Sequence, residues 1–92
     1  MNNVNTRPLT SAQIRAARAL LRWSAEDLAR HSMVSVATVR RAELEEEKTS
    51  MTLANNLAVR RACESAGVEF IDENGGGAGV RLRARSQGKS RK

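Results

Sequence analysis

The chain has 92 residues and a formal net charge of +6, with 16 Lys and Arg residues against 10 Asp and Glu residues. This length allows one small domain, and the single cysteine excludes an intrachain disulfide and a cysteine-based zinc site. No apolar run approaches the roughly 18 residues that cross a bilayer, and the first residues lack the apolar segment of a signal peptide. We therefore expect a cytoplasmic protein with no membrane partner.

The excess of positive charge lies at one end of the sequence. Six basic residues and no acidic residue follow residue 80, so the preceding part carries ten of each sign. Such a tail either adds salt-sensitive attraction to phosphates or is simply solvated, and the composition leaves both open. We expect residues 1–9 to be a disordered polar leader and residues 84–92 to be a disordered basic tail.

A first helix is predicted from Thr10 to about Trp23. Thr10 and Gln13 have the spacing of a capping box, in which each side chain satisfies the backbone N–H of the other residue. Apolar residues then recur at helical spacing on one face, which consists of Ile14, Ala17, Leu20 and Leu21. A core of aliphatic residues with only one Trp and one Phe suits a small helical bundle.

Two short helices separated by a tight corner are predicted next. Ser24 and Asp27 have capping-box spacing at the start of the first. Ser35 can cap the second, which would bury Val39 and Ala42. A short helix, a turn of three or four residues and a second helix form the helix-turn-helix unit, which presents its second helix to the DNA major groove.

A fourth helix is predicted from Thr52 to Ala66, followed by a glycine at a position suited to ending a helix. Its predicted buried face consists of Leu53, Leu57, Ala58, Ala62 and Cys63. The expected fold is therefore mainly α, with four or five helices forming a helix-turn-helix domain over residues 10–67.

A β-hairpin is predicted over residues 68–83, where two short apolar runs flank a glycine-rich loop. Two strands alone are marginally stable in water. Pairing with a second copy would extend the sheet and bury Phe70 and Leu82, so we expect the hairpin to be a dimerisation element. The alternative is a hairpin that folds back on its own helices.

The residues of the two short helices resemble the phage-repressor and Cro-like (Xre-type) helix-turn-helix family. The matching positions are Leu28, Ala29, Val34, Ser35, Val39 and Glu43. The resemblance runs from about residue 10 to residue 66, and the residues after it resemble the ending of small bacterial Xre-type regulators. It implies a Cro/repressor-like domain, a homodimer, and an ion pair between Arg18 on the preceding helix and Glu43.

The motif is partly degenerate by comparison with that family. Met33 at the turn, and Arg22 and Glu45 at two other positions, stand where the family usually has glycine. Ala25 replaces a polar residue that contacts phosphate in the family. Residues 45–47 are all glutamate, and three carboxylates beside a DNA backbone are repulsive. We expect a reshaped turn and a surface near electrical neutrality.

The resemblance implies that the second motif helix reads the major groove. The residues expected at bases or phosphates are Ser35, Val36, Ala37, Thr38, Arg40 and Arg41. Arg41 is suited to a bidentate contact with guanine. The first functional hypothesis is therefore a small dimeric transcriptional regulator, a repressor, whose partner is double-stranded operator DNA.

The second hypothesis is a helix-turn-helix protein that no longer depends on DNA. Such a protein would bind and inhibit another transcriptional regulator, as an antiactivator does. Its contact patch would consist of Met33, Val34, Val36 and Leu44, with the nearby acidic run giving charge specificity. An antitoxin-like role that combines DNA and protein binding lies between the two hypotheses.

Nothing in the sequence favours catalysis or a bound cofactor. His31 is the only histidine and has no second ligand at metal-binding spacing. The glycine run at residues 75–77 lacks the Lys-Ser/Thr of a phosphate-binding loop. We therefore expect neither an enzyme nor a metal protein.

Overall fold

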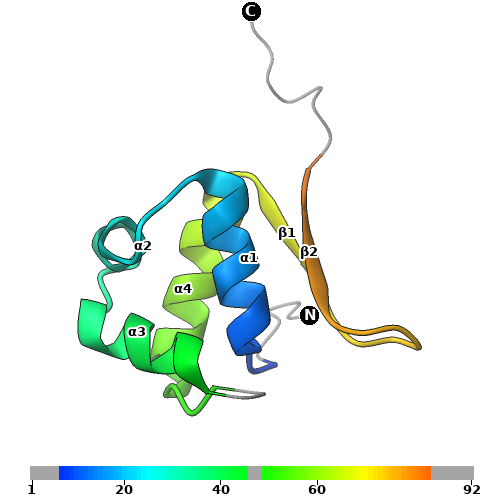
Figure 1. The fold of residues 1–92 in the computed structure, drawn as a ribbon, viewed down its shortest axis with the longest axis horizontal. Coiled ribbons are helices and arrows are strands. Elements are labelled where there is room, and N and C mark those ends of the chain that lie inside the picture. The colour runs from blue at the N-terminus through cyan, green and yellow to red at the C-terminus, as the bar shows by residue number, and fades with distance from the viewer. Residues whose placement is uncertain (1–6, 46–48, 84–92) are drawn as a thin grey trace, which may run out of the picture.

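The computed structural model describes residues 7–45 and 49–83. Within these residues the helices are α1 (Ser11–Leu21), α2 (Ala25–Ser32), α3 (Val36–Leu44) and α4 (Leu53–Ser65). They precede an antiparallel pair of strands, β1 (Val68–Ile71) and β2 (Gly79–Leu82) (Figure 1). The mainly helical class and the C-terminal hairpin are thus confirmed. Residues 1–6 of the expected leader and all of the expected tail lie outside the described residues.

The helices begin at the side-chain caps that the sequence indicated. Thr10 with Gln13 and Ser24 with Asp27 form complete capping boxes at α1 and α2. The Ser35 hydroxyl accepts a hydrogen bond from a backbone N–H in the first turn of α3. Each such cap stabilises its helix by about 1 kcal/mol, which is why short helices with few apolar residues form at these positions.

Two helices end at residues that are not glycine but adopt the left-handed conformation. Arg22 ends α1 with a φ of 59°, and Met33 ends α2 with a φ of 62°. A side chain in this conformation costs roughly 1–2 kcal/mol. The expectation of a reshaped turn is therefore wrong, because the left-handed corner is kept at a cost in strain.

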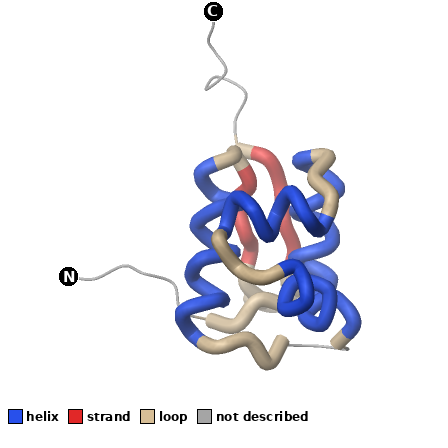
Figure 2. The backbone as a smooth tube through the Cα atoms, turned by 90° about the vertical axis from the view of Figure 1, so that its left-hand side faces the viewer, coloured by secondary structure: helices blue, strands red, loops and turns tan. Residues whose placement is uncertain are grey.

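The core lies where the four helices meet the inner face of the hairpin. α1 and α4 stand between the α2–α3 pair on one side and the hairpin on the other (Figure 1), and the side view places the helices in front of the two strands (Figure 2). The largest fully buried side chains are Leu9, Ile14, Leu28, Val39, Val59, Val68 and Cys63. One continuous apolar cluster therefore joins the helices to the sheet.

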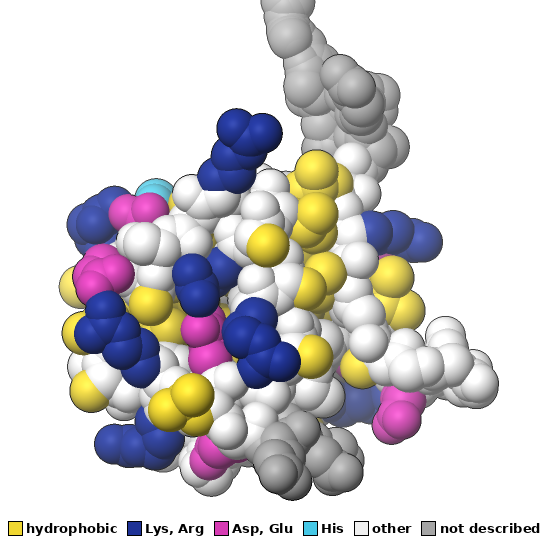
Figure 3. All heavy atoms as spheres, in the orientation of Figure 1, with side chains coloured by type: hydrophobic (Ala, Val, Ile, Leu, Met, Phe, Trp, Pro, Cys, Tyr) yellow, Lys and Arg dark blue, Asp and Glu magenta, His cyan; other side chains and the backbone are white. Residues whose placement is uncertain are grey.

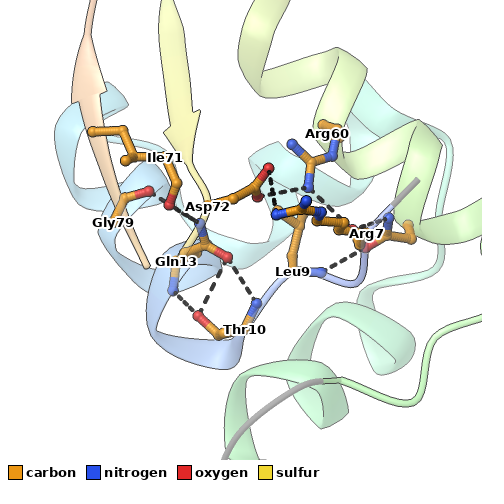
Figure 4. Close-up of polar contacts among 9 residues, drawn as sticks. Arg7, Leu9, Thr10, Gln13, Arg60, Ile71, Asp72 and Gly79 are labelled. Carbon is orange, nitrogen blue, oxygen red and sulfur yellow. Dashed lines mark hydrogen bonds and ion pairs between the residues drawn. The ribbon is translucent and has the colours of Figure 1, made fainter. Parts of the chain in front are cut away.

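The expected boundary of the domain at residue 10 is wrong, because Leu9 belongs to the core. Its side chain is 0% exposed, and its backbone N–H donates to the Asn56 side-chain oxygen at 2.9 Å. The Thr49 N–H donates to the Leu9 carbonyl at 3.1 Å. The side chains of Asn56 and Arg60 donate to the Arg7 carbonyl (Figure 4). We call residues 7–9 the N-terminal strap.

The buried face of α4 agrees with the expected one in part, because Cys63 is buried and Ala58 and Ala62 pack against the core. Leu53 is 57% exposed, whereas Asn56 and Arg60 are each 3% exposed. Val59 and Cys63 complete the buried face. The buried polar side chains hold the N-terminal strap by hydrogen bonds, which reduce the cost of burying them. The Arg60 Nε is an exception, since it is buried without a hydrogen-bond partner. An apolar pattern alone does not reveal that a helix also buries polar residues.

A side chain from α1 holds the far end of the hairpin. The Gln13 amide nitrogen donates to the carbonyls of Ile71 at 3.2 Å and Gly79 at 3.0 Å. These two residues face each other across the strands, and Figure 4 shows the amide pointing at both. Gln13 therefore both caps α1 and fixes the hairpin against it.

Candidate nucleic-acid interface

The α2–α3 pair has the spacing of a helix-turn-helix. Eight residues of α2 and nine of α3 are separated only by residues 33–35. The inner face of α3 buries Val39 and Ala42 at 1% and 2% exposure. Its outer face is open to solvent and carries Ala37, Arg40, Arg41 and Leu44.

One residue of the turn between α2 and α3, Val34, was predicted to lie at the surface but is buried. Val34 is 5% exposed and lies in the core cluster, so its place in the expected apolar patch is wrong. Its N–H donates to the Ala29 carbonyl at 3.2 Å, and Ser32 accepts from it as well. The left-handed corner at Met33 turns the next side chain inward, which a hydropathy pattern does not reveal.

The ion pair implied by the family resemblance is present. Arg18 Nε lies 2.7 Å from Glu43 Oε2, and Arg18 Nη2 lies 2.8 Å from Oε1. The side chains are only 24% and 10% exposed. The hydrogen bond to Glu43 is the largest influence that raises the pKa of Arg18 above its ordinary value. A bidentate, part-buried pair of this kind ties the last turn of α3 to α1.

A second α1 arginine fixes α3 and was missed by the sequence reasoning. Arg15 Nη1 donates to the Glu43 backbone carbonyl at 2.6 Å. This carbonyl is one of those that a helix leaves without an internal partner, and a cation near it complements the helix dipole. The only available signal was the position of Arg15, three residues before Arg18 on the same helix.

The hydroxyl groups at the start of α3 take part in hydrogen bonds within the helix terminus itself. Ser35 Oγ accepts from the Thr38 N–H at 3.1 Å and donates to Thr38 Oγ1 at 2.9 Å. Ser35 is exposed and Thr38 is half-buried. Val36 is half-buried against the core, and Ala37 is exposed. Of the apolar residues expected at bases, only Ala37 is therefore fully presented.

The two adjacent arginines of α3 each have an acidic neighbour. Arg40 forms an exposed ion pair with Glu26 of α2. Arg41 is close enough to Glu45 to contribute to a lowered pKa of that carboxyl. The larger cause of this shift is Ser50, which donates to Glu45 from its hydroxyl and its N–H. The first carboxylate of the acidic run thus turns toward Ser50.

Charges of both signs alternate over the face made by α1, α2 and α3. Figure 3 shows arginine side chains spread over these helices with carboxylates between them. Arg30 on α2 is likewise paired, at 2.7 Å, with Asp27. Hydrogen bonds from the Ser24 backbone and from Arg30 lower the Asp27 pKa to about 2. The surface is therefore mixed in charge and contrasts with the uniform basic stripe typical of strong nucleic-acid binders.

The β1 half of the hairpin's inner face is buried within one chain. Phe70 is 8% exposed, with the Arg60 guanidinium 5.3 Å from its ring centre. The expectation that Phe70 requires a second copy for burial is therefore wrong. Leu82 shares the inner face, opposite Val68, but remains 51% exposed. The end of β2 thus projects past the helices that cover β1.

The cysteine and the histidine of the described residues both pack within the domain. The Cys63 thiol is buried, and desolvation raises its pKa to about 12, which removes the thiolate needed for reactivity. His31 stacks on Trp23 with ring centres 4.2 Å apart. Within residues 7–45 and 49–83, no group of three His, Cys, Asp or Glu side chains is placed to hold a metal ion. The described helices include none with the length and apolar character to cross a membrane.

No protein-family model matches the chain, and no curated protein matches it significantly. Any functional assignment therefore depends on the residues and the geometry described above.

Proposed function

We propose that the protein is a small transcriptional regulator, a repressor, with a Cro/repressor-like helix-turn-helix domain that binds operator DNA through α3. The observation that carries this proposal is the free outer face of α3. It presents Ala37, Arg40 and Arg41 to solvent while the opposite face is buried. A short helix held against a compact body with one free, arginine-bearing face fits the major groove.

Arg41 is the residue best placed to read a base. It is exposed, and its guanidinium can make the bidentate contact to guanine O6 and N7 that arginine favours. Ala37 lies one turn earlier on the same face and can contact a thymine methyl group. The Arg18–Glu43 pair and Arg15 hold the helix at a fixed angle to α1, which provides the rigidity that groove docking requires.

The proposal includes a homodimer formed through the hairpin. The half-exposed Leu82 and the outer edge of β2 provide an apolar side chain and a strand edge for a second copy. Dimeric helix-turn-helix proteins bind two half-sites about 34 Å, or one turn of DNA, apart. Operator sites with two-fold symmetry are expected for this reason.

Arg41→Ala is expected to weaken binding to operator DNA roughly tenfold or more, because it removes a base contact worth about 1–3 kcal/mol. Genomic fragments captured by the purified full-length chain supply the duplex, and fluorescence anisotropy measures the affinity. Arg61→Ala is the matched control, since it removes the same charge from the exposed side of α4. Equal losses in both variants, or no capture of DNA by the wild-type chain at low salt, would contradict DNA reading by α3.

A second candidate function, inhibition of another transcriptional regulator by direct contact, is favoured by two exposed apolar side chains. Met33, which ends α2, is 89% exposed, and Leu44, the last residue of α3, is 83% exposed. Large apolar residues presented in this way are typical of protein contact sites rather than of phosphate contact sites. The acids near Arg40 and Arg41 would then give the contact its charge specificity.

Met33→Asp separates this function from DNA reading. For a protein contact we expect this variant to bind a regulator recovered by pull-down with the wild-type chain at least tenfold more weakly, because a charge is then buried against an apolar surface. Aspartate tolerates the left-handed conformation of residue 33, so the fold is expected to persist. Calorimetry with the purified partner provides the measurement. A partner lost with Arg41→Ala and retained with Met33→Asp would refute the apolar contact.

A further inference from the structure

We propose that Glu26 is an intramolecular competitor for Arg40, holding a guanidinium that would otherwise contact a DNA phosphate and thereby weakening the binding of α3 to DNA. This inference rests on the proposed DNA-binding function and adds a residue that sets its strength. It concerns the side of α3 next to the start of α2. The competitor is part of the same chain, so its effective concentration is always high.

The pair bridges the two helices of the proposed DNA-binding unit. Glu26 lies in the first turn of α2, and Arg40 lies in the middle of α3. Their side chains are 58% and 57% exposed, so a phosphate can reach the same guanidinium from solvent. A part-buried structural pair such as that of Arg18 is not accessible to a ligand in this way.

The fold has little need of the Glu26 carboxylate. The start of α2 is already capped by Ser24 and Asp27, and Asp27 already supplies an acidic group there. An ion pair between two exposed side chains contributes little to stability. The contact between Glu26 and Arg40 is therefore expected to affect ligand binding at this surface more than it affects the stability of the fold.

The competition is electrostatic. The Glu26 carboxyl has a lowered pKa, chiefly because it accepts its own backbone N–H and secondly because Arg40 is near, so it carries its charge at neutral pH. A carboxylate in contact with Arg40 repels an approaching phosphate and cancels the charge that would release counterions from DNA. Arg41, one residue further on, is exposed to solvent.

Glu26→Gln is expected to tighten binding to a 24-base-pair duplex roughly fivefold to tenfold at about 0.1 M salt, and to steepen the slope of log affinity against log salt by about 0.9. The duplex is one captured by the wild-type chain, and anisotropy at four salt concentrations gives both quantities. The gain is expected to depend on Arg40, so the double variant Glu26→Gln/Arg40→Ala is expected to lose it. Arg40→Ala alone is expected to weaken binding, because it leaves the Glu26 carboxylate without its counter-ion beside the DNA.

Glu69→Gln is the matched control, because it also adds one positive charge by releasing an arginine from an exposed pair, here Arg81 at 3.0 Å on the hairpin. It is expected to change the affinity less than twofold, with the oligomeric state of each variant checked by size-exclusion chromatography. Three results would overturn the inference while DNA binding stands. Glu26→Gln and Glu69→Gln could give equal gains, the double variant could still bind more tightly than the wild-type chain, or Glu26→Gln could bind more weakly. Absence of DNA binding by the wild-type chain and by every variant would instead remove the proposed function itself.

Discussion

Glu43→Gln is expected to lower the free energy of unfolding by about 2–3 kcal/mol, because it leaves the Arg18 guanidinium part-buried without its counter-ion. Because glutamine has nearly the same size as glutamate, the decrease in stability measures the effect of removing the charge. Removing one partner of a fully buried ion pair lowers the free energy of unfolding by about 3–5 kcal/mol. The cost is smaller here because the Arg18 side chain is 24% exposed. Urea denaturation at pH 7, followed by circular dichroism, measures the change.

Two further variants test the origin of this loss. Replacing both partners, Arg18→Met/Glu43→Leu, is expected to destabilise less than Glu43→Gln, since no charge is then left unpaired. Glu69→Gln breaks an exposed pair and is expected to leave the urea midpoint nearly unchanged. If Glu43→Gln behaved like Glu69→Gln, the pair would not be what holds α3 against α1.

Leu9→Ala is expected to lower the free energy of unfolding by about 2–4 kcal/mol, because it leaves a cavity at a fully buried site. The Leu9 side chain is 0% exposed, and the backbone on both sides of it is hydrogen-bonded to Asn56 and Thr49. For a domain of this size each kcal/mol lowers the melting temperature by roughly 4–8 °C. Thermal denaturation followed by circular dichroism therefore measures a clear shift.

Leu53→Ala is the matched control for the N-terminal strap. Leu53 is 57% exposed at the start of α4, so the same substitution there is expected to shift the melting temperature only slightly. The sequence pattern predicts the reverse order, with Leu53 in a buried face and Leu9 in a disordered leader. A larger loss at Leu53 than at Leu9 would show that the strap does not belong to the fold.

The mixed charge of the α1–α3 face explains why composition alone is a poor guide to the function of this chain. The exposed arginines of α2 and α3 have acidic neighbours, such as Asp27 for Arg30 and Glu26 for Arg40. A formal charge of +6 therefore describes the C-terminal end of the sequence and says little about α3. Which charges a ligand meets depends on pairs formed between helices.

Local signals predicted the secondary structure well. The capping boxes at Thr10 and Ser24 depend on residues three positions apart, so they are visible in the sequence. The hairpin follows from two apolar runs around a glycine-rich loop. The Arg18–Glu43 pair, 25 residues apart, was predicted only through the family resemblance, because no local pattern links two charges on different helices.

The amino-acid sequence by itself determined where the helices and the hairpin begin, because caps and periodicity act within a few residues along the chain. Only the tertiary structure decided that Leu9 is core, that Val34 is hidden, and that Arg40 meets Glu26. The physical reason is that Leu9 and Arg40 contact groups 47 and 14 residues away, which are brought together only when the helices pack. Val34 is hidden because the left-handed corner at Met33 turns it inward.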